Sequence, residues 1–387
     1  MSAPVVAGDD VSLVSSWPAW VRDVLVLGGT TLLWGLIMFF AARAAGFDPW
    51  ATWTWGRWDS GQYLSIADSG YIYERCVGVA NRGPDDWCGN SGWFPGYPYM
   101  MRVGSWFGRS HFTAGRVISF LAMVGTWAAL WFGFLRRRPL AAGVLGMMIA
   151  AAFPASVYYG AVFPISTMLL AVMLALVCLD RQRWLLAGAC GAVVAMVYTS
   201  GFVVVVVAIV PLTALSIGDL RTRVRAALMV AVPVVLGYFA VLVNFQRAVG
   251  AWVALINTQA SSNFEPAFPL VTISRQAQKL VDDAMPGIIG VQTLLVAAMV
   301  IAAMVVALCD RSDLSLGERG AIVLVLALWV LPLTLGGDLS LYRAESLLLP
   351  VVILLTRLRV PIVAGFAVMC VPVCYLMARL FFDATLI

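Results

Sequence analysis

Long apolar runs separated by short polar connectors dominate the chain. Most runs reach about 17–25 residues, the length at which an α-helix crosses a hydrocarbon core of roughly 30 Å. The pattern predicts about eleven transmembrane helices. The stretch 184–217 fits either two crossings or one broken crossing. The expected bounds are roughly 23–45, 113–135, 140–160, 163–179, 184–199, 201–217, 226–246, 286–308, 320–336, 346–356 and 360–381.

The composition indicates that lipid is the solvent of this chain. Hydrophobic residues make up 62% of it and charged residues 12%, whereas a soluble domain has about 45–50% and about 25%. We therefore expect an all-α polytopic membrane protein, with a polar segment 1–22 followed by one transmembrane domain over 23–382. The segment carries Asp9 and Asp10 and lacks the positive start of a cleaved signal peptide, so the first span is expected to remain.

Charge patterning predicts how the spans are oriented. The basic residues behind the net charge of +5 are scattered and form no patch with interleaved aromatics, so nucleic-acid binding is not expected. If the chain has eleven spans, one set of arginines lies in connectors on the same side of the membrane. Cytoplasmic loops hold an excess of Arg and Lys, so this side is expected to be the cytoplasmic one. The N-terminus is then cytoplasmic, and the long loops 46–112 and 247–285 lie outside. The set is Arg136, Arg137, Arg138, Arg181, Arg183, Arg221, Arg223, Arg225, Arg311, Arg319, Arg357 and Arg359.

The two long outer loops are where function is expected, because long loops between packed spans are more often functional than filler. The first holds Cys76 and Cys88 on the oxidising side, which favours a disulfide over two unpaired thiols. A single histidine and no close cysteine quartet argue against a zinc site. Arginine stands almost everywhere in place of lysine, as is typical of a GC-rich genome, so we expect a bacterial plasma membrane.

The first loop places a carboxylate at the expected membrane edge. From Asp59 onward the spacing predicts a short interfacial helix, in which Tyr63, Ile66 and Gly70 share a face with Asp59. Asp68 lies about half a turn away, so it is the weaker partner. A carboxylate at the edge of lipid is costly unless it is paired or used, which makes Asp59 a functional candidate. The alternative is a helix N-cap.

Residues 93–98 of the same loop read Trp-Phe-Pro-Gly-Tyr-Pro. Two prolines exclude a regular helix, because each lacks an N–H and restrains the residue before it. The stretch is therefore expected to form a rigid aromatic corner. It either anchors the second span at the interface or walls a pocket for a sugar or a polyprenyl chain.

These blocks, in this order, resemble the PIG-V family of mannosyltransferases. Fainter similarity continues to the penultimate span, at residues 153–156, 183–188 and 342–350. The chain departs from the family pattern at 163–166, where members usually show a tyrosine and a glutamate, and around 198–200, where an arginine is often found. The residues that carry the resemblance are Trp58, Asp59, Ser60, Tyr63, Leu64, Ile66, Ala67, Gly70 and Tyr71, then Phe94, Pro95, Gly96, Tyr97, Pro98 and Arg102.

The resemblance implies a GT-C glycosyltransferase that takes mannose from a polyprenyl-phosphate donor. By residue match, its essential carboxylate is Asp59. A carboxylate there would accept the proton of an acceptor hydroxyl while the lipid phosphate leaves from the opposite face, so that configuration inverts. The acceptor would be a lipid or a glycan. The residues expected to wall the substrate pocket are Trp58, Tyr63, Asp68, Phe94, Tyr97 and His111.

The departing phosphate needs positive charge, which arginine supplies with two parallel donors. Arg343 is the first choice, because it lies in a short outer turn and matches the family's arginine; the alternatives are pairing with Glu345 and anchoring to lipid head groups. Arg275 and Lys279 could equally form a membrane-surface face of an amphipathic helix. Arg102 completes the set of candidates.

Three expectations remain open at this stage. His111, the single histidine, could relay a proton, contact phosphate or be a plain interfacial residue. No metal or other cofactor is expected, since the loop carboxylates show no convergent pair. The runner-up functions are transfer of arabinofuranose or another polyprenyl-linked sugar, and lipid or sugar transport. A transporter would place ionisable groups near the midplane and show repeats.

Overall fold

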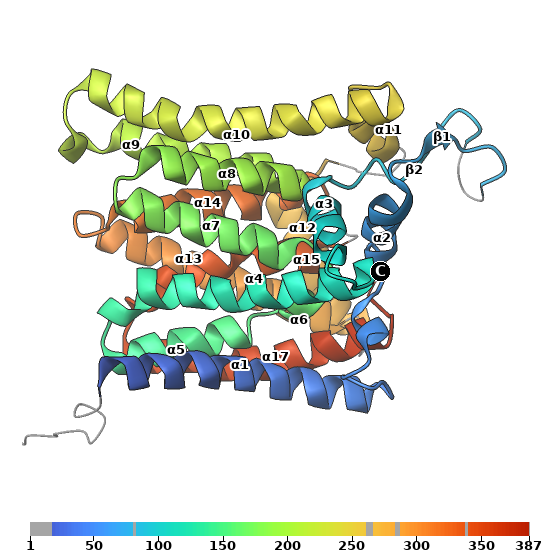
Figure 1. The fold of residues 1–387 in the computed structure, drawn as a ribbon. Coiled ribbons are helices and arrows are strands. Elements are labelled where there is room, and N and C mark those ends of the chain that lie inside the picture. The colour runs from blue at the N-terminus through green and yellow to red at the C-terminus, as the bar shows by residue number, and fades with distance from the viewer. Residues whose placement is uncertain (1–17, 80–82, 261–265, 283–286, 337–339, 387) are drawn as a thin grey trace, which may run out of the picture.

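The computed structural model of the protein is a bundle of helices that run side by side along one direction (Figure 1). It describes residues 18–79, 83–260, 266–282, 287–336 and 340–386. Most of the expected polar segment 1–22 and parts of the expected loop 247–285 lie outside these ranges. Within them, 6 helices are long and apolar enough to cross a membrane. These are α1 (Ala19–Ala44), α4 (His111–Gly133), α10 (Leu220–Val249), α13 (Gly287–Cys309), α14 (Leu316–Thr334) and α17 (Val360–Phe382).

The other apolar segments are shorter or broken. The stretch 184–217 folds back on itself as two antiparallel elements, because Gly201 approaches Val194 so closely that a Cβ there would lie 2.0 Å from the Val194 carbonyl oxygen. Fewer helices therefore have full membrane length than the apolar runs predicted. These segments are α5 (Leu140–Ala151), α7 (Ile165–Asp180), α8 (Trp184–Val197), η4 (Thr199–Ala208), α9 (Ile209–Thr213), α15 (Leu341–Glu345), η6 (Ser346–Val351) and α16 (Val352–Leu355).

The chain between α5 and α7 is irregular apart from α6 (Val157–Gly160), yet it is buried throughout. Its carbonyl groups are satisfied from neighbouring helices. The Trp34 indole donates to the Ser156 oxygen at 3.1 Å, and the Ser119 hydroxyl donates to the Phe163 oxygen at 3.0 Å. Irregular backbone at membrane depth is tolerated only where protein surrounds it. This stretch therefore lies inside the bundle, in contact with α4, α7 and α17.

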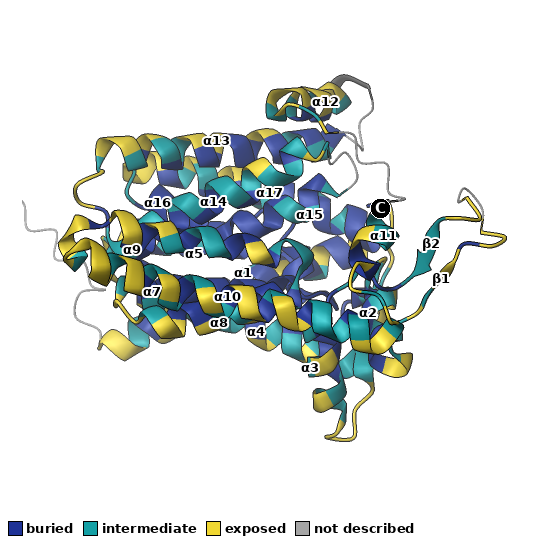
Figure 2. Cartoon of the chain, turned by 90° about the horizontal axis from the view of Figure 1, so that it is seen from above, coloured by how far each residue is buried: buried dark blue, intermediate teal, exposed yellow. Residues whose placement is uncertain are grey.

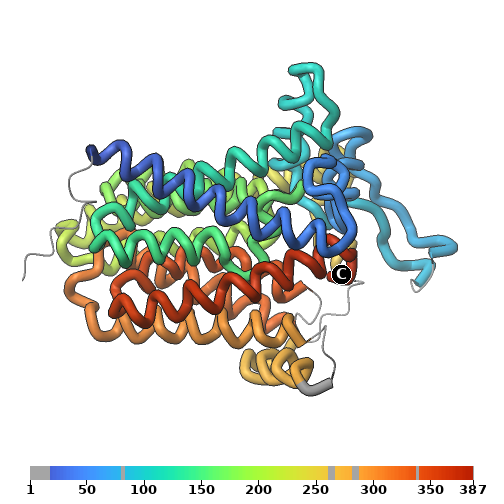
Figure 3. Tube along the Cα trace, turned by 90° about the horizontal axis from the view of Figure 1, so that it is seen from below, coloured from blue at the N-terminus to red at the C-terminus, as the bar shows by residue number. Residues whose placement is uncertain are grey.

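The first and last helices lie side by side, so the bundle closes between the two ends of the chain (Figure 3). Near the last turn of α17, Phe382 meets the Trp55 ring edge-on at 5.3 Å between centroids. Trp55 belongs to η2 (Thr52–Trp55), in the connector that follows α1. This contact fixes the start of the first long loop against the C-terminal helix.

One end of the bundle, which we call the loop end, carries the elements of the first long loop together with α11 (Figure 1). A two-stranded antiparallel hairpin pairs Tyr73 with Gly89 and Arg75 with Trp87. The amphipathic helix α12 (Pro269–Asp282) lies along α13 near the same end (Figure 2). The loop elements are α2 (Ser60–Ser69), β1 (Tyr73–Arg75), β2 (Trp87–Gly89), α3 (Gly96–Ser105) and α11 (Ala254–Ala260).

The opposite end, which we call the arginine end, gathers the connectors that carry the arginine set. It includes η3 (Leu135–Arg137) and η5 (Leu215–Ile217). Glu318, in the first turn of α14, accepts hydrogen bonds from Arg138 and from Arg357, the latter at 2.9 Å through Nε and 2.9 Å through Nη2. The buried Glu318 carboxylate thus joins three connectors at this end.

Candidate active site

Asp59 occupies the N-cap position of α2, but its side chain caps nothing. It forms an ion pair with Arg343, which lies 284 residues further along the chain. The residue before it, Trp58, has a φ of 49°, in the left-handed region that non-glycine residues rarely adopt. The backbone therefore turns sharply just before the carboxylate, and the turn directs it away from the helix end.

Arg343 is held by a second backbone turn of the same kind. Ser340, at the N-cap of α15, has a φ of 79°, and its hydroxyl oxygen accepts a hydrogen bond from Arg343 Nη2. Residues in sparsely populated conformations cluster at functional sites, because the surrounding structure must hold them there. The ion pair therefore has such a residue on each side, one before Asp59 and one before Arg343.

Aromatic side chains surround the Arg343 guanidinium, which lies 5.9 Å from the Phe163 ring centroid. Burial opposes its charge, but the Asp59 carboxylate and the nearby Tyr198 and Tyr158 raise its pKa above the ordinary value of 12.5. The side chains of Arg343 and Asp59 are 15% and 27% exposed. The pair is thus held in a low-dielectric wall, while part of the carboxylate still reaches solvent.

A cavity of about 600 Å³ at the loop end contains this pair. Among the described residues that line it, Asp59 and Arg343 are the charged ones. The other polar groups are neutral amides and hydroxyls, which can both donate and accept hydrogen bonds. Apolar and aromatic walls close the rest. The neutral polar residues are Gln62, Tyr63, Tyr198, Thr199, Ser200, Thr258, Gln259 and Ser340.

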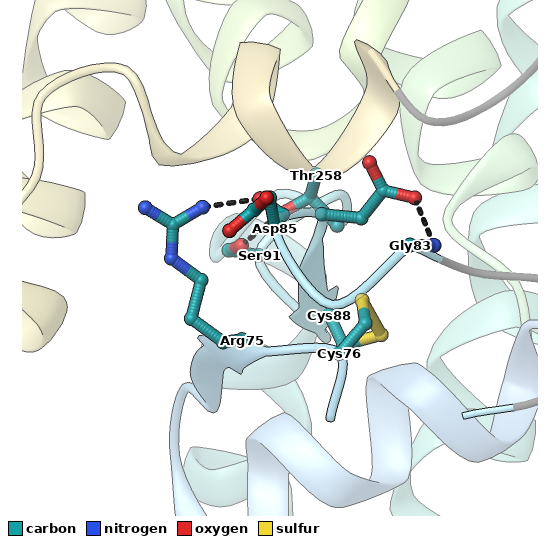
Figure 4. Close-up of a disulfide and its surroundings, with 8 residues drawn as sticks. Arg75, Cys76, Gly83, Asp85, Cys88, Ser91 and Thr258 are labelled. Carbon is teal, nitrogen blue, oxygen red and sulfur yellow. Dashed lines mark hydrogen bonds between the residues drawn. A yellow bond between two sulfur atoms is a disulfide. The ribbon is translucent and has the colours of Figure 1, made fainter. Parts of the chain in front are cut away.

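The hairpin forms one wall of the cavity. Cys76 and Cys88 are joined by a disulfide that closes it (Figure 4), and both Cys88 and Trp87 line the cavity. Next to the hairpin, the Ser91 and Thr258 hydroxyls hydrogen-bond at 2.6 Å. The first long loop is therefore tied to α11, which supplies the facing wall.

The predicted pocket residues are divided between the cavity and the core behind it. Tyr63 lines the cavity, and its ring meets that of Tyr97 edge-on at 5.6 Å. Tyr97 is fully buried and donates to the Gly115 oxygen at 2.9 Å. Phe94 packs against Phe245 in a small separate core cluster. Trp58 is 44% exposed and is not among the lining residues.

The remaining sequence candidates lie away from the cavity. Arg102 closes the last turn of α2, donating to the Ala67 oxygen at 2.7 Å and to the Ile66 oxygen at 2.6 Å. His111 pairs with Asp68 on the surface between α2 and α4. Arg275 and Lys279 belong to α12, and neither lines the cavity.

Several lining residues gave no signal in the sequence. Gln62 lies one position before Tyr63 on the same short helix, and Tyr198 occupies the extended break between α8 and η4. That break coincides with the departure from the family pattern at 198–200, which was the available hint. Thr258 and Gln259 reach the cavity only because α11 folds back over the hairpin, and no local pattern foretells such a contact.

Arg116 is a half-buried arginine that the sequence patterns did not single out. It lies in α4 with its guanidinium carbon 3.9 Å from the Trp55 ring centroid, and it donates to the Gly160 oxygen. A charged residue inside a span is costly unless it is paired or hydrogen-bonded. Here it satisfies a carbonyl of the irregular central stretch.

No three His, Cys, Asp or Glu side chains of the described chain gather closely enough to hold a metal ion. The expected absence of a cofactor remains a prediction.

Comparison with known proteins adds evidence on the fold. No family model matches the chain, and no curated protein matches it. The fold is similar to that of the archaeal oligosaccharyltransferase AglB from Archaeoglobus fulgidus in complex with an inhibitory peptide and a dolichol-phosphate, with a TM-score of 0.54 at 11% identity over 95% of this chain and 56% of that one. A crystal structure of the Archaeoglobus fulgidus oligosaccharyltransferase in the apo form gives 0.56 at 12% identity over 95% and 57%.

The chain thus spans little more than half the length of these structural neighbours. The similarity confirms the expected fold class as an all-α bundle of a membrane protein, while the GT-C type remains a prediction. At this level of identity it concerns the fold alone. The resemblance to the PIG-V family remains a prediction.

Proposed function

We propose that the protein is a membrane glycosyltransferase that moves mannose from a polyprenyl-phosphate-mannose donor to a hydroxyl of a lipid or glycan acceptor. The Asp59–Arg343 pair in the wall of the loop-end cavity is the observation that carries the proposal. A carboxylate beside a guanidinium, among neutral hydrogen-bonding groups, suits a reaction between an uncharged hydroxyl and a phosphosugar. The archaeal neighbour's complex with a dolichol-phosphate supports a lipid-phosphate donor.

The ion pair suggests how the donor switches the site on. Before the donor binds, Asp59 and Arg343 neutralise each other. A donor phosphate offers Arg343 a second anionic partner with matching geometry. When Arg343 turns to the phosphate, the Asp59 carboxylate becomes free to act as a base. Donor binding and activation of the base are thereby coupled through one side chain.

The chemical step uses each group once. The acceptor oxygen forms a bond to the anomeric carbon, while the bond from that carbon to the phosphate oxygen breaks. The hydroxyl proton goes to Asp59, and the polyprenyl phosphate leaves with the bonding electrons toward Arg343. Attack from the face opposite the leaving group inverts the configuration. Stabilising the departing charge in a partly water-free site is a large catalytic term.

We further propose that the loop end faces the outside of a bacterial plasma membrane and that the arginine end faces the cytoplasm. The arginine-rich connectors support this orientation. Arabinofuranose or another polyprenyl-linked sugar would fit the same chemistry. Transport is less well supported, since Asp59 stands at the start of the loop-end helix α2 and the charged pair lines the loop-end cavity.

The test is sugar transfer by the purified protein in proteoliposomes. Labelled polyprenyl-phosphate-mannose and a membrane lipid extract are supplied, and a labelled glycosylated product is expected. Asp59→Asn should lower transfer by about 10²–10⁴-fold, because it removes the base, while donor binding is kept or strengthened because Arg343 loses its competitor. Asp68→Asn, on the surface away from the cavity, is the matched control. Wild-type turnover in Asp59→Asn would exclude Asp59 as the base.

A further inference from the structure

A second hollow of about 790 Å³ opens near the arginine end, along the seam between α8 and α10. Leu185 of α8 lines one side of it. Arg221, Arg225, Leu228 and Val232 line the other side and all belong to α10. This groove is remote from the loop-end cavity, and the proposed glycosyl transfer makes no use of it.

The α10 side of the groove changes from cationic to apolar along its length. Arg221, Arg225, Leu228 and Val232 follow one another at intervals of three or four residues, so their side chains form one stripe on the helix. All four side chains are exposed, and exposed residues, drawn in yellow, recur along α10 in Figure 2. From the first to the last, the stripe rises about 16 Å at 1.5 Å per residue. Its apolar part, from Leu228 to Val232, rises about 6 Å at 1.5 Å per residue, enough for the first part of an acyl chain.

The floor of the groove is fixed by direct backbone contact. A Cβ at Gly188 of α8 would lie 2.4 Å from the Met229 carbonyl oxygen and 2.9 Å from the Pro233 ring. The two helices already touch beneath the hollow and cannot close it by moving together. The groove is therefore a permanent feature of the lipid-facing surface.

The two arginines at the mouth of the groove form no ion pair among the described residues. Their neighbour Arg223 points elsewhere and donates to the Leu212 oxygen at 3.2 Å. The Asp219 carboxylate is engaged as the N-cap of α10, where it accepts from the Thr222 N–H at 3.0 Å. Two guanidinium groups one helical turn apart thus face the mouth of an apolar channel.

We propose that this groove binds an anionic phospholipid of the adjacent leaflet, with the lipid phosphate between Arg221 and Arg225 and an acyl chain along Leu228 and Val232. Arginine matches phosphate geometry with paired donors. Basic pockets between spans bind acidic head groups. The change from charged to apolar surface along one groove fits an amphipathic molecule and not a soluble anion. A zwitterionic head group would bring its own cation toward the two guanidinium groups.

Native mass spectrometry of the full chain in detergent tests the site. Dioleoyl-phosphatidylglycerol and dioleoyl-phosphatidylcholine are titrated separately, and tighter retention of phosphatidylglycerol is expected. The double variant Arg221→Gln, Arg225→Gln should lose at least about tenfold in its affinity for phosphatidylglycerol, through lost charge-assisted bonds. The matched control is Arg181→Gln, Arg183→Gln, which removes two exposed charges from the α7–α8 connector outside the groove.

A second variant tests the apolar half without altering charge. Val232→Trp should fill the channel and lower phosphatidylglycerol retention, with both arginines still in place. Equal losses in the control double variant, or unchanged retention in Val232→Trp, would overturn the proposal in favour of diffuse surface attraction. A dimer whose abundance falls in the groove variants would assign the groove to a second copy of the chain and also overturn it. Should the double variant fail to fold, the single arginine variants and Val232→Trp decide the question.

Discussion

Asp59 and Arg343 face each other from turns of unusual backbone conformation, at Trp58 and Ser340. Both turns destabilise the folded state, because each non-glycine residue in the left-handed region costs about 1–3 kcal/mol of folding free energy. Packing around the cavity offsets that cost and fixes the backbone from which the two side chains extend. Little backbone rearrangement is therefore needed before ligands enter.

Replacing the guanidinium should weaken donor use more than it weakens the fold. In Arg343→Ala, a phosphate that makes charge-assisted bonds with this group loses about 1.5–3 kcal/mol, so the KM for the donor should rise by roughly ten- to a hundredfold. Donor titration of transfer in proteoliposomes measures this rise. Lys279→Ala, on α12 and outside the cavity lining, should keep the wild-type KM. If Arg343→Ala and the wild type have the same KM for the donor, the donor phosphate binds to another residue.

Glu345 lies on the other face of α15 from Arg343, and one of its carboxylate oxygens accepts from the Gln292 amide at 2.8 Å. Burial raises the pKa of Glu345 from 4.5 to about 8, although hydrogen bonds from Gln292 and Thr293 lower it. The folded protein therefore keeps this proton up to about pH 8, while the unfolded chain releases it near 4.5. Stability is lost as pH rises through that window, because the folded state binds more protons than the unfolded state.

Glu345→Gln should remove this dependence, because an amide of the same shape carries no titrating proton. The melting temperature of the variant, relative to wild type, should increase between pH 5 and pH 8. Glu74→Gln, on an exposed strand of the hairpin, provides the control and should show no such trend. A constant difference in melting temperature across the range would mean that Glu345 titrates normally.

The sequence was sufficient to nominate Asp59 and Arg343 separately, because a carboxylate at the membrane edge and an arginine in an outer turn are each unusual. It was not sufficient to pair them, since their contact depends on how the whole bundle packs. Arg102 illustrates the converse. Its position near the aromatic corner resembled a phosphate ligand, but the free carbonyls at the end of α2 attract its guanidinium. Helix ends of this kind are not visible before the tertiary structure is known.

Among the elements, the β1–β2 hairpin depends most on a covalent link. It has two short strands, and isolated hairpins are marginal in water. The Cys76–Cys88 bond closes it beside Trp87, whose ring stacks on Tyr73 at 4.1 Å between centroids. This wall of the cavity therefore relies on a bond that reducing agents can break.

Cys76→Ser with Cys88→Ser should loosen the hairpin while the bundle stays folded. Closing a loop of this size contributes about 2–4 kcal/mol, and the loss should be confined to the hairpin. Hydrogen exchange should show faster exchange of amides at 73–75 and 87–89, with α4 and α13 unchanged. Cys309→Ser, which removes an exposed free thiol at the arginine end, is the control. Unaltered protection in the hairpin would mean that its packing alone suffices.

The apolar runs predicted that the elements are helices, but they did not predict where the helical backbone is interrupted. Helices such as α13 and α17, each of 23 residues, are long enough to cross a hydrocarbon core. The stretch between α5 and α7 is equally apolar, yet it breaks around Ala155, whose φ is 58°. There the neighbouring helices supply hydrogen bonds to the backbone, so apolar character no longer requires a helix. Pro154 and Pro164 mark this stretch in the sequence, but a proline alone does not separate the two cases, since α10, α14 and α17 each contain one and remain helical.

Across the whole molecule, the arginine end holds the connectors together by charge. Glu318 is 3% exposed and lies between Arg138 and Arg357. Removing one member of a buried ionic group leaves the others unpaired, which typically costs about 3–5 kcal/mol.

Glu318→Ala should therefore lower the free energy of unfolding, and the melting temperature measured in detergent should fall clearly. Asp310→Asn offers the comparison, because that carboxylate is 43% exposed and lies 3.5 Å from Arg357. Its loss should cost about 0–1 kcal/mol, as exposed pairs do. Similar melting temperatures for the two variants would show that the connectors are held by packing and not by charge.

The separation of 284 residues between the paired charges also constrains how the protein is made. A ribosome feeds segments into the membrane in order, so Asp59 enters long before its partner, which is made 284 residues later. Until α14 and α15 have been inserted, no nascent chain holds both charges. Chains interrupted before residue 343 would leave that early carboxylate without its counter-ion, so the cavity wall would lack one of its two charges.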